Sequence, residues 1–394
     1  MGCSVPGKLI ENALSDPDSG SSNPSHVLDQ RDDESEIERV ANSLDVCMKV
    51  VGCGGAGSNT VDRCWTSGLH VELCAMNTDA KHILNVKANR KILLGRVLTR
   101  GLGAGAKPEI GEKAALEAEQ EITDYLEGSQ IVFVTAGMGG GTGTSSSAVV
   151  SSLAKRRGAL TIGVVTLPFK SEGELRMRNA MDGLSKLAKI CDTTIVVPND
   201  TLLELVPHLP VQAAFKVADE LLVQTISGMT DMLTSAGLVN VDYADLRTIL
   251  NEGGVSLIGV GESSLRDSSE RLMEAVESAL GSPLLGRMDL RGARGALVRI
   301  VGGPDMTIEE AAKAAEMVTS SIRPDGRMIW GCSVEPSMTG KVKVLLIVTG
   351  AQSKYVLVRS GEDPAMMPTC ADYRGVINVP SASSEDEDLS MFVR

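Results

Sequence analysis

The chain of 394 residues has an apolar fraction of 43% and a net charge of −13, which predict two globular domains with tails. The acidity belongs to the ends: ten Asp/Glu against three Lys/Arg give residues 1–47 a net charge of −7, and four acids against one Arg give residues 381–394 a net charge of −3. These values exclude a general nucleic-acid binder, which would need a basic face. The longest apolar runs are about as long as residues 344–348, which excludes direct membrane insertion by a spanning helix.

The chain opens with an acidic extension, residues 1–47, that is expected to be largely disordered apart from a short helix near residues 37–44. From Met48, short apolar runs alternate with helical stretches over residues 48–210. The expected strands are 48–51, 73–77, 92–94, 131–135, 161–165 and 194–197, and the expected helices begin near Asn59, span 110–127 and 145–157, and lie between the last two strands. This alternation predicts a parallel sheet covered on both faces, with ligands at the carboxyl ends of its strands.

A helix expected over residues 211–235 is apolar nearly all round, which indicates burial between two larger bodies. We therefore divide the chain after residue 210 into a central core helix (211–236), a second α+β domain (237–350) and a tail (351–394). The second domain should hold strands near 255–260, 296–301, 328–332 and 342–348 and helices near 268–280 and 308–322, the latter opened by a Thr307/Glu310 capping box. The tail has an acidic linker and a short apolar end.

Two glycine-rich segments, residues 52–59 and 137–144, each follow an expected strand and open an expected helix. Glycines at such positions let backbone N–H groups approach an anion in front of a helix N-terminus. The first segment also fits G-x-G-x-x-G, which alone is weak evidence for a dinucleotide site. Two such loops in one sheet favour a longer polyphosphate. The chain has no G-x-x-x-x-G-K-[ST] motif, so it is not a P-loop enzyme.

A third group, Asn240, Asp242 and Asp245, follows the central helix. Taken alone, two carboxylates three residues apart at such a place are typical of a turn and a helix N-cap. The glycine loops, however, hold no acid or base that could orient an attacking water. Both interpretations of the two acids therefore stay open.

These segments together resemble the FtsZ family, the tubulin-related GTPases of cell division, and especially its archaeal members. The resemblance rests on six motifs in the family order: the two glycine loops, Asn77-Thr78-Asp79, residues 98–106, Pro168-Phe169 with Glu172 and Arg176, and residues 240–245. It covers roughly residues 48–350. It implies an α/β fold of the tubulin/FtsZ type, with a Rossmann-like parallel-sheet GTPase domain, a central buried helix and a second α+β domain.

The resemblance implies GTP or GDP as the bound nucleotide, accompanied by Mg²⁺ or K⁺, without a metal site built by the protein alone. The residues expected to contact the nucleotide are Gly54, Gly55, Ala56, Gly57, Ser58, Gly141, Thr142 and Gly143 at the phosphates, Ala104 and Gly105 over the γ-phosphate, Glu172 and Arg176 beside the ribose and phosphates, and Asn59 and Asp219 at the base. A carboxylate suits guanine, because it can accept from N1–H and the exocyclic amine. Without the resemblance, Asp219 would be interpreted as a helix-surface acid.

In the family, the loop that corresponds to residues 240–245 reaches the nucleotide of the adjoining subunit. The resemblance therefore implies a head-to-tail homopolymer in which Asp242 and Asp245 polarise water or hold a cation, with Asn240 beside them. Such a heterologous contact does not close, so it makes filaments. Two departures from the family pattern are Ser145-Ser146-Ser147-Ala148, in place of Gly-Ser-Ala-Pro, and the pair Ala56 and Ser58 in the first loop, where many relatives have Gly and Asn.

Eight cysteines without a C-x-x-C pair indicate reduced thiols and a cytoplasmic protein. The resemblance adds the mid-cell division ring as the expected location. The last residues, 389–394, form an apolar peptide behind an acidic tether and are expected to dock a membrane-anchor protein at the division site.

Two other functions fit part of this pattern. An NAD-dependent dehydrogenase would use Gly52, Gly54 and Gly57, with Asp79 on the ribose, but it leaves the second glycine loop and residues 240–245 unexplained. A tubulin-like scaffold that binds nucleotide and hydrolyses it poorly is disfavoured because both acids, Asp242 and Asp245, are present.

Overall fold

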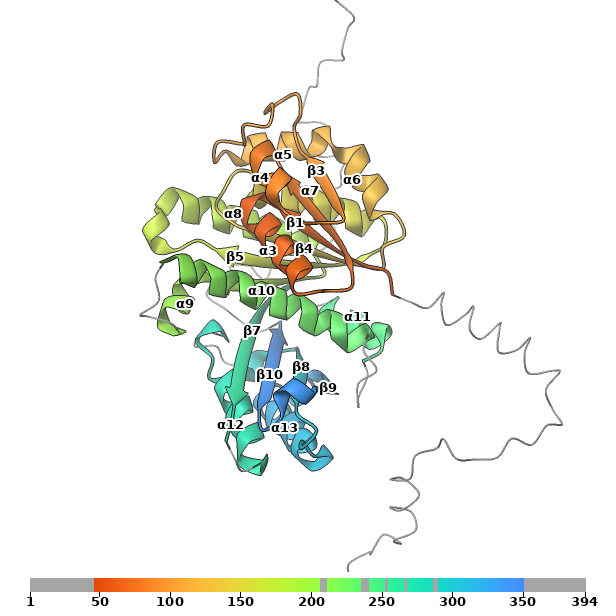
Figure 1. The fold of residues 1–394 in the computed structure, drawn as a ribbon, viewed down its shortest axis with the longest axis vertical. Coiled ribbons are helices and arrows are strands. Elements are labelled where there is room, and N and C mark those ends of the chain that lie inside the picture. The colour runs from red at the N-terminus through yellow and green to blue at the C-terminus, as the bar shows by residue number, and fades with distance from the viewer. Residues whose placement is uncertain are drawn as a thin grey trace, which may run out of the picture. The chain divides into compact units, whose positions relative to one another are not determined.

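The computed structural model describes residues 46–205, 211–234, 241–251, 254–265, 268–285 and 290–350. The expected helix near residues 37–44 and the tail beyond Gly350 lie outside these ranges. Within them, the strands join into one ten-stranded sheet in the order β3-β2-β1-β4-β5-β6-β7-β10-β8-β9 (Figure 1).

The first six strands are all parallel, as the continuous apolar runs predict. They are β1 (Met48–Cys53), β2 (Glu72–Asn77), β3 (Arg90–Leu93), β4 (Ile131–Gly137), β5 (Leu160–Leu167) and β6 (Thr193–Pro198). Their order places β2 and β3 on one side of β1 and β4 to β6 on the other. The connections therefore leave in opposite directions from β1 and β4, and such a switch point opens a crevice at the carboxyl ends of the strands.

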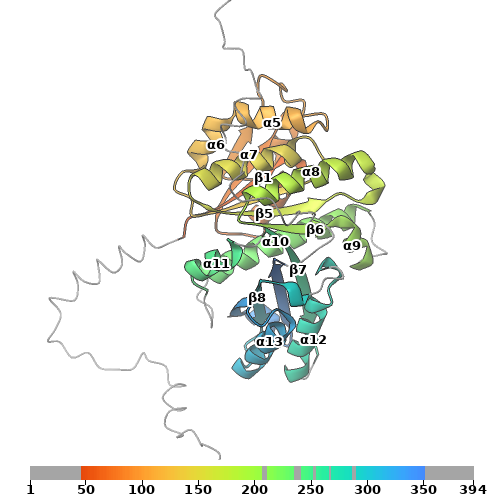
Figure 2. The ribbon, with the colours of Figure 1, turned by 180° about the vertical axis from the view of Figure 1, so that it is seen from behind.

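Helices cover both faces of this parallel part. They are α3 (Gly54–Thr66), α4 (Ala80–Asn85), α5 (Pro108–Glu117), α6 (Glu119–Leu126), α7 (Thr142–Arg156), α8 (Glu174–Ile190) and α9 (Asn199–Leu205). One core cluster packs α5, α6, α7 and α8 against strand residues such as Val51, and these helices lie in front in Figure 2. A second cluster packs α3 and α4 against the opposite face, where Val50 points.

Three expected boundaries are wrong. Helix α3 begins at Gly54 rather than near Asn59, and α7 begins at Thr142 rather than Ser145. Glycine is a weak helix former, so the glycine loops conceal the first helical turns in the sequence. The single helix expected over residues 110–127 is two helices, because Ala118 leaves helical geometry with a ψ of 15°.

Helix α10 (Val211–Thr234) is largely buried from Leu221 to Leu233, as predicted, whereas Phe215, Lys216 and Glu220 nearer its start are exposed. Its Leu222, Ile226 and Met229 join a core cluster that also contains Val164 of β5 and Leu297 of β8. The helix therefore packs between the parallel strands and the later strands of the sheet (Figure 1).

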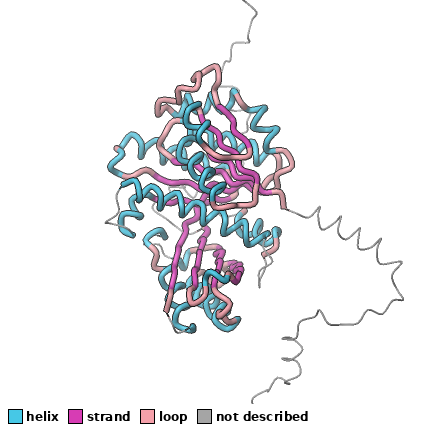
Figure 3. The backbone as a smooth tube through the Cα atoms, in the orientation of Figure 1, coloured by secondary structure: helices cyan, strands magenta, loops and turns pink. Residues whose placement is uncertain are grey.

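The remainder of the sheet is mixed. It contains β7 (Gly254–Ser263), β8 (Gly295–Gly302), β9 (Arg327–Val334) and β10 (Val342–Thr349), with helices α11 (Tyr243–Leu250), α12 (Ser268–Leu280) and α13 (Ile308–Ser321). Strand β7 pairs with β6 in parallel over Thr193–Ile195, and the Thr193 and Ser256 hydroxyls lie 2.7 Å apart. The two expected domains thus share one sheet, whose strands can be followed through both parts in Figure 3.

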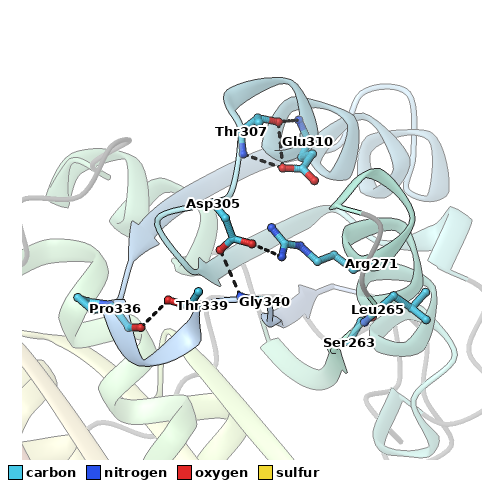
Figure 4. Close-up of polar contacts among 9 residues, drawn as sticks. All are labelled: Ser263, Leu265, Arg271, Asp305, Thr307, Glu310, Pro336, Thr339 and Gly340. Atoms are coloured by element: carbon cyan, nitrogen blue, oxygen red, sulfur yellow. Dashed lines mark hydrogen bonds and ion pairs between the residues drawn. The ribbon is translucent and has the colours of Figure 1, made fainter. Parts of the chain in front are cut away.

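Polar contacts fasten the turns of the second part (Figure 4). The buried guanidinium of Arg271 on α12 forms an ion pair with Asp305, whose carboxylate also accepts a hydrogen bond of 3.3 Å from Gly340 N. Thr307 and Glu310 form the predicted capping box at the start of α13, with Thr307 N donating to Glu310 Oε2 at 2.7 Å. These contacts join the β8–α13 and β9–β10 connections.

Candidate functional site

The two glycine loops meet at the carboxyl edge of β1 and β4, which are neighbours in the sheet. Gly54 has a φ of 71°, and a Cβ added there would lie 2.7 Å from Gly143 N. Only glycine permits this left-handed backbone and this close approach of the two loops. The N-termini of α3 and α7 therefore start side by side, and neither first turn carries an acid. Two helix N-termini without a nearby acid or a side-chain cap make a site for a strongly negative group, because their first backbone N–H groups point toward it.

A third segment lies against the second loop. A Cβ added to Gly141 would lie 2.8 Å from Lys107 N and 2.9 Å from Ala104 Cβ. Gly105 next to it has a φ of 59° and open space around it. The structure thus brings Ala104 and Gly105 to the glycine loops, at the place where the end of a polyphosphate chain would lie.

Threonines fix the start of the second helix. The Thr142 and Thr78 hydroxyls lie 2.7 Å apart and are buried, and Gly139 N donates to Thr144 Oγ1 at 2.8 Å. These bonds join the turn after β2 to the second glycine loop. The Ser58 hydroxyl near the start of α3 is buried and has no hydrogen-bond partner among the described residues.

Glu172 and Arg176 flank the other side of the second loop. Arg176 Nη1 forms an ion pair with the Glu172 carboxylate, which also accepts from Phe169 N at 2.9 Å. A Cβ added to Gly139 would lie 2.7 Å from Arg176 O, so this pair is held directly against the loop. Arg176 is exposed and able to turn toward an anion.

Asn59 and Asp219 lie at the far side of α3 from the second loop. Asn59 is exposed in the second turn of α3, and Arg63 one turn later holds Asp219 on α10, with 3.2 Å between Nε and Oδ2. Burial raises the pKa of the Asp219 carboxyl to about 6, although the positive charge of Arg63 opposes this rise. The arrangement places a carboxylate and an amide at one end of the glycine loops.

Asp242 and Asp245 are not brought to this site. Asp242 caps α11 by accepting from Ala244 N at 3.2 Å, and Asp245 is exposed in the first turn. The Tyr243 hydroxyl donates to Gln130 O at 3.3 Å, directly before β4. Helix α11 therefore lies at the amino edge of the parallel strands, whereas the glycine loops lie at the carboxyl edge. Asn240 lies outside the described residues.

Comparison with known proteins identifies the family. Residues 47–207 match the GTPase domain of the tubulin/FtsZ family, and residues 254–352 match the C-terminal domain of the FtsZ family. Over 331 residues the chain is 50% identical to cell division protein FtsZ 1 of Archaeoglobus fulgidus, which covers 84% of this chain and 89% of that protein. A solved FtsZ dimer from M. jannaschii is 44% identical and has a TM-score of 0.77, covering 85% of this chain and 98% of that one.

The chain belongs to the FtsZ family. It is a cell-division GTPase that forms filaments, and the tubulin/FtsZ fold that the resemblance implies is confirmed. A more distant likeness, 21% identity at a TM-score of 0.66 to CetZ2 from Haloferax volcanii, shows the shared fold alone. The dehydrogenase alternative is wrong. Asp79, which it would place on a ribose, instead caps α4 by accepting from His82 N at 3.0 Å.

Sequence reasoning missed two side chains in this FtsZ site. Phe215 is 42% exposed, one turn before Asp219 on α10, and packs edge-on against Phe169 with 5.2 Å between the ring centroids. An exposed aromatic at that position can stack on a base, and its spacing from Asp219 was a signal in the sequence. His82 lies between Asn77 and Asn59, and no local pattern indicated it.

The described part of this FtsZ contains no group of three or more His, Cys, Asp or Glu side chains that could hold a metal ion. In the same ranges no helix combines the length and apolarity that crossing a membrane requires.

Proposed function

We propose that this FtsZ binds GTP in the crevice between β1 and β4 and hydrolyses it when Asp242 and Asp245 of a second copy approach the γ-phosphate. The proposal rests on one observation above all: the phosphate-binding loops and the two acids lie at opposite edges of the same parallel strands.

The arrangement of the loops supports the pose of the nucleotide. The α- and β-phosphates would lie between Gly54–Gly57 and Gly141–Gly143, where two helix N-termini supply N–H groups and positive potential. The γ-phosphate would then lie under Ala104 and Gly105. Glu172 and Arg176 would lie beside the ribose and phosphates, where a guanidinium can bind phosphate oxygens.

The base would lie between Asn59 and Asp219, over the exposed face of Phe215. An ionised Asp219 accepts hydrogen bonds from guanine N1–H and the 2-amino group. Adenine offers an acceptor at N1, which would face the carboxylate with no hydrogen between them. Preference for GTP over ATP follows from this mismatch, because an unsatisfied charged group is more costly than a lost hydrogen bond.

Distance supports catalysis between subunits. Asp219 and Met232 are 13 residues apart on α10, which corresponds to about 20 Å of helix, and Val241 N donates to Met232 O at 3.5 Å, so Asp242 lies near that end of the helix. A carboxylate must come within hydrogen-bond reach of the attacking water, so Asp242 and Asp245 cannot serve their own nucleotide. A neighbour stacked head to tail would bring its amino edge onto this carboxyl edge.

Exposed apolar side chains support a second copy as the covering surface. Leu84, Val97, Leu102 and Leu175 are each more than two-thirds exposed, and Leu102 reaches 88%. All four belong to segments that follow carboxyl ends of strands, the edge of the sheet at which the glycine loops lie. Apolar residues gathered around a site are typical of an interface, and a heterologous contact here would extend into a filament.

The proposed chemistry is attack of water on the γ-phosphorus with loss of GDP. The neighbour's Asp242 and Asp245 would orient the water and draw its proton, while the loop N–H groups stabilise charge that develops on the phosphate oxygens. A Mg²⁺ or K⁺ ion bound with the nucleotide would neutralise part of the negative charge on the phosphate oxygens.

Mixing two inactive variants tests the proposal. Gly55→Asp puts a carboxylate at the phosphate site, and its Cβ meets no atom within 4 Å, so the substitution should block GTP without disturbing the fold. Asp245→Ala should bind GTP and assemble but hydrolyse slowly. Each variant alone should be nearly inactive, whereas an equal mixture should recover up to about a quarter of wild-type turnover through random head-to-tail junctions.

Gly55→Ala and Glu316→Ala are the matched controls, since they change the same loop without charge and an exposed helical acid elsewhere. Both should keep concentration-dependent GTPase activity. A mixture no more active than its two components, or a wild-type rate per molecule that does not fall on dilution, contradicts shared catalysis.

We also propose that residues 389–394 dock a membrane-anchor protein and bring the filament to the mid-cell ring in the cytoplasm. These residues lie outside the described ranges, and the support is their apolar composition behind an acidic tether. A chain that lacks them should assemble normally in solution but lose its position at the division site when imaged in cells. Normal placement of that truncated chain would contradict the proposal.

A further inference from the structure

His82 on α4 joins two asparagines through its ring. Its Nδ1 lies 3.3 Å from Asn77 Nδ2, and its Nε2 lies 3.1 Å from Asn59 Oδ1. The backbone N of His82 donates to the Asp79 carboxylate at 3.0 Å, which fixes the start of the helix and with it the ring. The proposed GTPase chemistry gives this histidine no task.

The hydrogen bonds of Asn77 determine which ring nitrogen carries the proton. Asn77 Oδ1 accepts from Thr78 N at 2.8 Å and from Asp79 N at 3.3 Å, so its Nδ2 is the donor that faces His82. Nδ1 of His82 must then be the acceptor, and the proton resides on Nε2. Because Asn77 is buried, its amide has no alternative partner in water.

The proton on Nε2 of His82 also determines the orientation of the Asn59 amide. The Nε2–H of His82 donates to Asn59 Oδ1, so the carbonyl end of this amide is occupied. The NH₂ end of Asn59 is left to face outward, and Asn59 is exposed. In the absence of His82 the amide could rotate and present either end.

We propose that His82 is a positioning residue that makes Asn59 a hydrogen-bond donor toward the purine base. The inference rests on the proposed base site between Asn59 and Asp219. A donor at Asn59 and an acceptor at Asp219 together match a 6-oxopurine, which has an acceptor at O6 and a donor at N1. Adenine has the opposite pattern at both positions. His82 therefore adds discrimination at position 6 to that of Asp219 at positions 1 and 2, by holding one amide in its binding orientation.

The chemistry of glutamine provides a rescue. Its amide presents an oxygen acceptor and a nitrogen donor about as far apart as the two ring nitrogens of histidine. His82→Gln should therefore accept from Asn77 and donate to Asn59, whereas His82→Leu fills similar space and can do neither. His70 is exposed in the connection before β2, which makes His70→Leu the matched control.

The test measures dissociation constants of GDP, IDP and ADP for the full chain, by competition with a fluorescent GDP at concentrations below assembly. His82→Leu should weaken GDP and IDP by the same factor, about threefold to tenfold for one neutral hydrogen bond, and leave ADP unchanged. His82→Gln and His70→Leu should match the wild type. Equal weakening of all three nucleotides, or no change in any, would overturn the inference, because it would assign His82 a structural role or none.

Two further measurements separate this inference from the base site on which it rests. Asp219→Ala should remove the preference for GDP over IDP. If this variant keeps the preference while the His82 variants behave as expected, the proposed base site at Asp219 is wrong. The long-range ¹H–¹⁵N spectrum of histidine-labelled protein should show His82 with its proton on Nε2, identified by the signal that disappears in His82→Gln. A proton on Nδ1 would overturn the proposed role of His82, whatever the binding data show.

Discussion

The half-buried carboxyl of Asp219 allows a test in which stability and binding respond in opposite directions. Burial raises its pKa from 3.8 to about 6, a change that corresponds to about 3 kcal/mol between the two protonation states. Because the folded pKa is raised, the fold favours the protonated form. The corresponding stability is fully present below about pH 4 and is lost as the pH rises through 6. At neutral pH the empty site therefore holds an ionised acid that destabilises the protein.

Asp219→Asn keeps the shape of the side chain and removes the charge. Urea denaturation of the nucleotide-free protein between pH 4 and pH 7.5 should show the variant gaining up to about 3 kcal/mol relative to the wild type as the pH rises. This value already includes the attraction between Arg63 and the ionised carboxylate, which opposes the rise in pKa. The exposed Glu220 on the same helix supplies the control, Glu220→Gln. A stability difference that stays constant across this pH range would refute the reasoning.

The affinity for GDP should fall in Asp219→Asn, whereas its stability should rise. In the proposed base site guanine donates to the ionised carboxylate, so GDP should bind the wild type far more tightly than Asp219→Asn. The affinity of the wild type should fall as the pH drops below 6. At pH 6 the free acid is half protonated, so binding should release about half a proton, which calorimetry in two buffers of different ionisation enthalpy measures. Absence of proton release would show that the base does not contact this carboxyl.

Three other substitutions have defined outcomes. Gly54→Ala should lower the urea midpoint and abolish nucleotide binding, because its φ of 71° and a Cβ 2.7 Å from Gly143 N require the loops to separate; Gly55→Ala, with open space, should unfold at the wild-type midpoint. Phe215→Ala should weaken GDP by about 1–3 kcal/mol in the competition assay through lost stacking, and Phe215→Tyr should retain affinity. Asp305→Ala should lower the urea midpoint more than the double variant Asp305→Ala with Arg271→Met does. The single variant leaves the buried guanidinium of Arg271 without its charged partner, whereas the double variant removes the guanidinium as well.

The sequence predicted the elements whose signal is local. Continuous apolar runs located all six parallel strands, and the Thr307/Glu310 box located the start of α13 within one residue. The starts of α3 and α7 were misplaced, because the first turns of both helices are held by the opposing loop across the crevice rather than by helix-forming residues. The pairing of β6 with β7 joins Thr193 to Gly254 over only three residue pairs, and no local pattern encodes so distant a contact.

Some residues of the candidate site have a local signal in the sequence, and others do not. The glycine loops were visible because each loop carries its own chemistry in consecutive residues. His82 was not visible, because its neighbours Asn77 and Asn59 are brought to it only by the fold. Phe215 carried one local signal, its spacing from Asp219, but its contact with Phe169 also depends on the fold. Asp219 was assigned through the resemblance alone, since on α10 it looks like any partly exposed helical acid.

The two interpretations of Asp242 are compatible. As the N-cap of α11 it uses Oδ1 to accept from Ala244 N, and this bond leaves Oδ2 available. Helix α11 is held to the amino edge of the sheet by Tyr243, whose hydroxyl donates to Gln130 O. A cap that fixes a carboxylate on a rigid helix also preorganises it, which lowers the entropic cost of aligning a water. In the proposed filament, Asp242 at the start of α11 in one subunit would for that reason be well placed to complete the site of the next subunit. Helix α10 is too long to let the two half-sites meet within one chain, and hydrolysis would therefore depend on assembly.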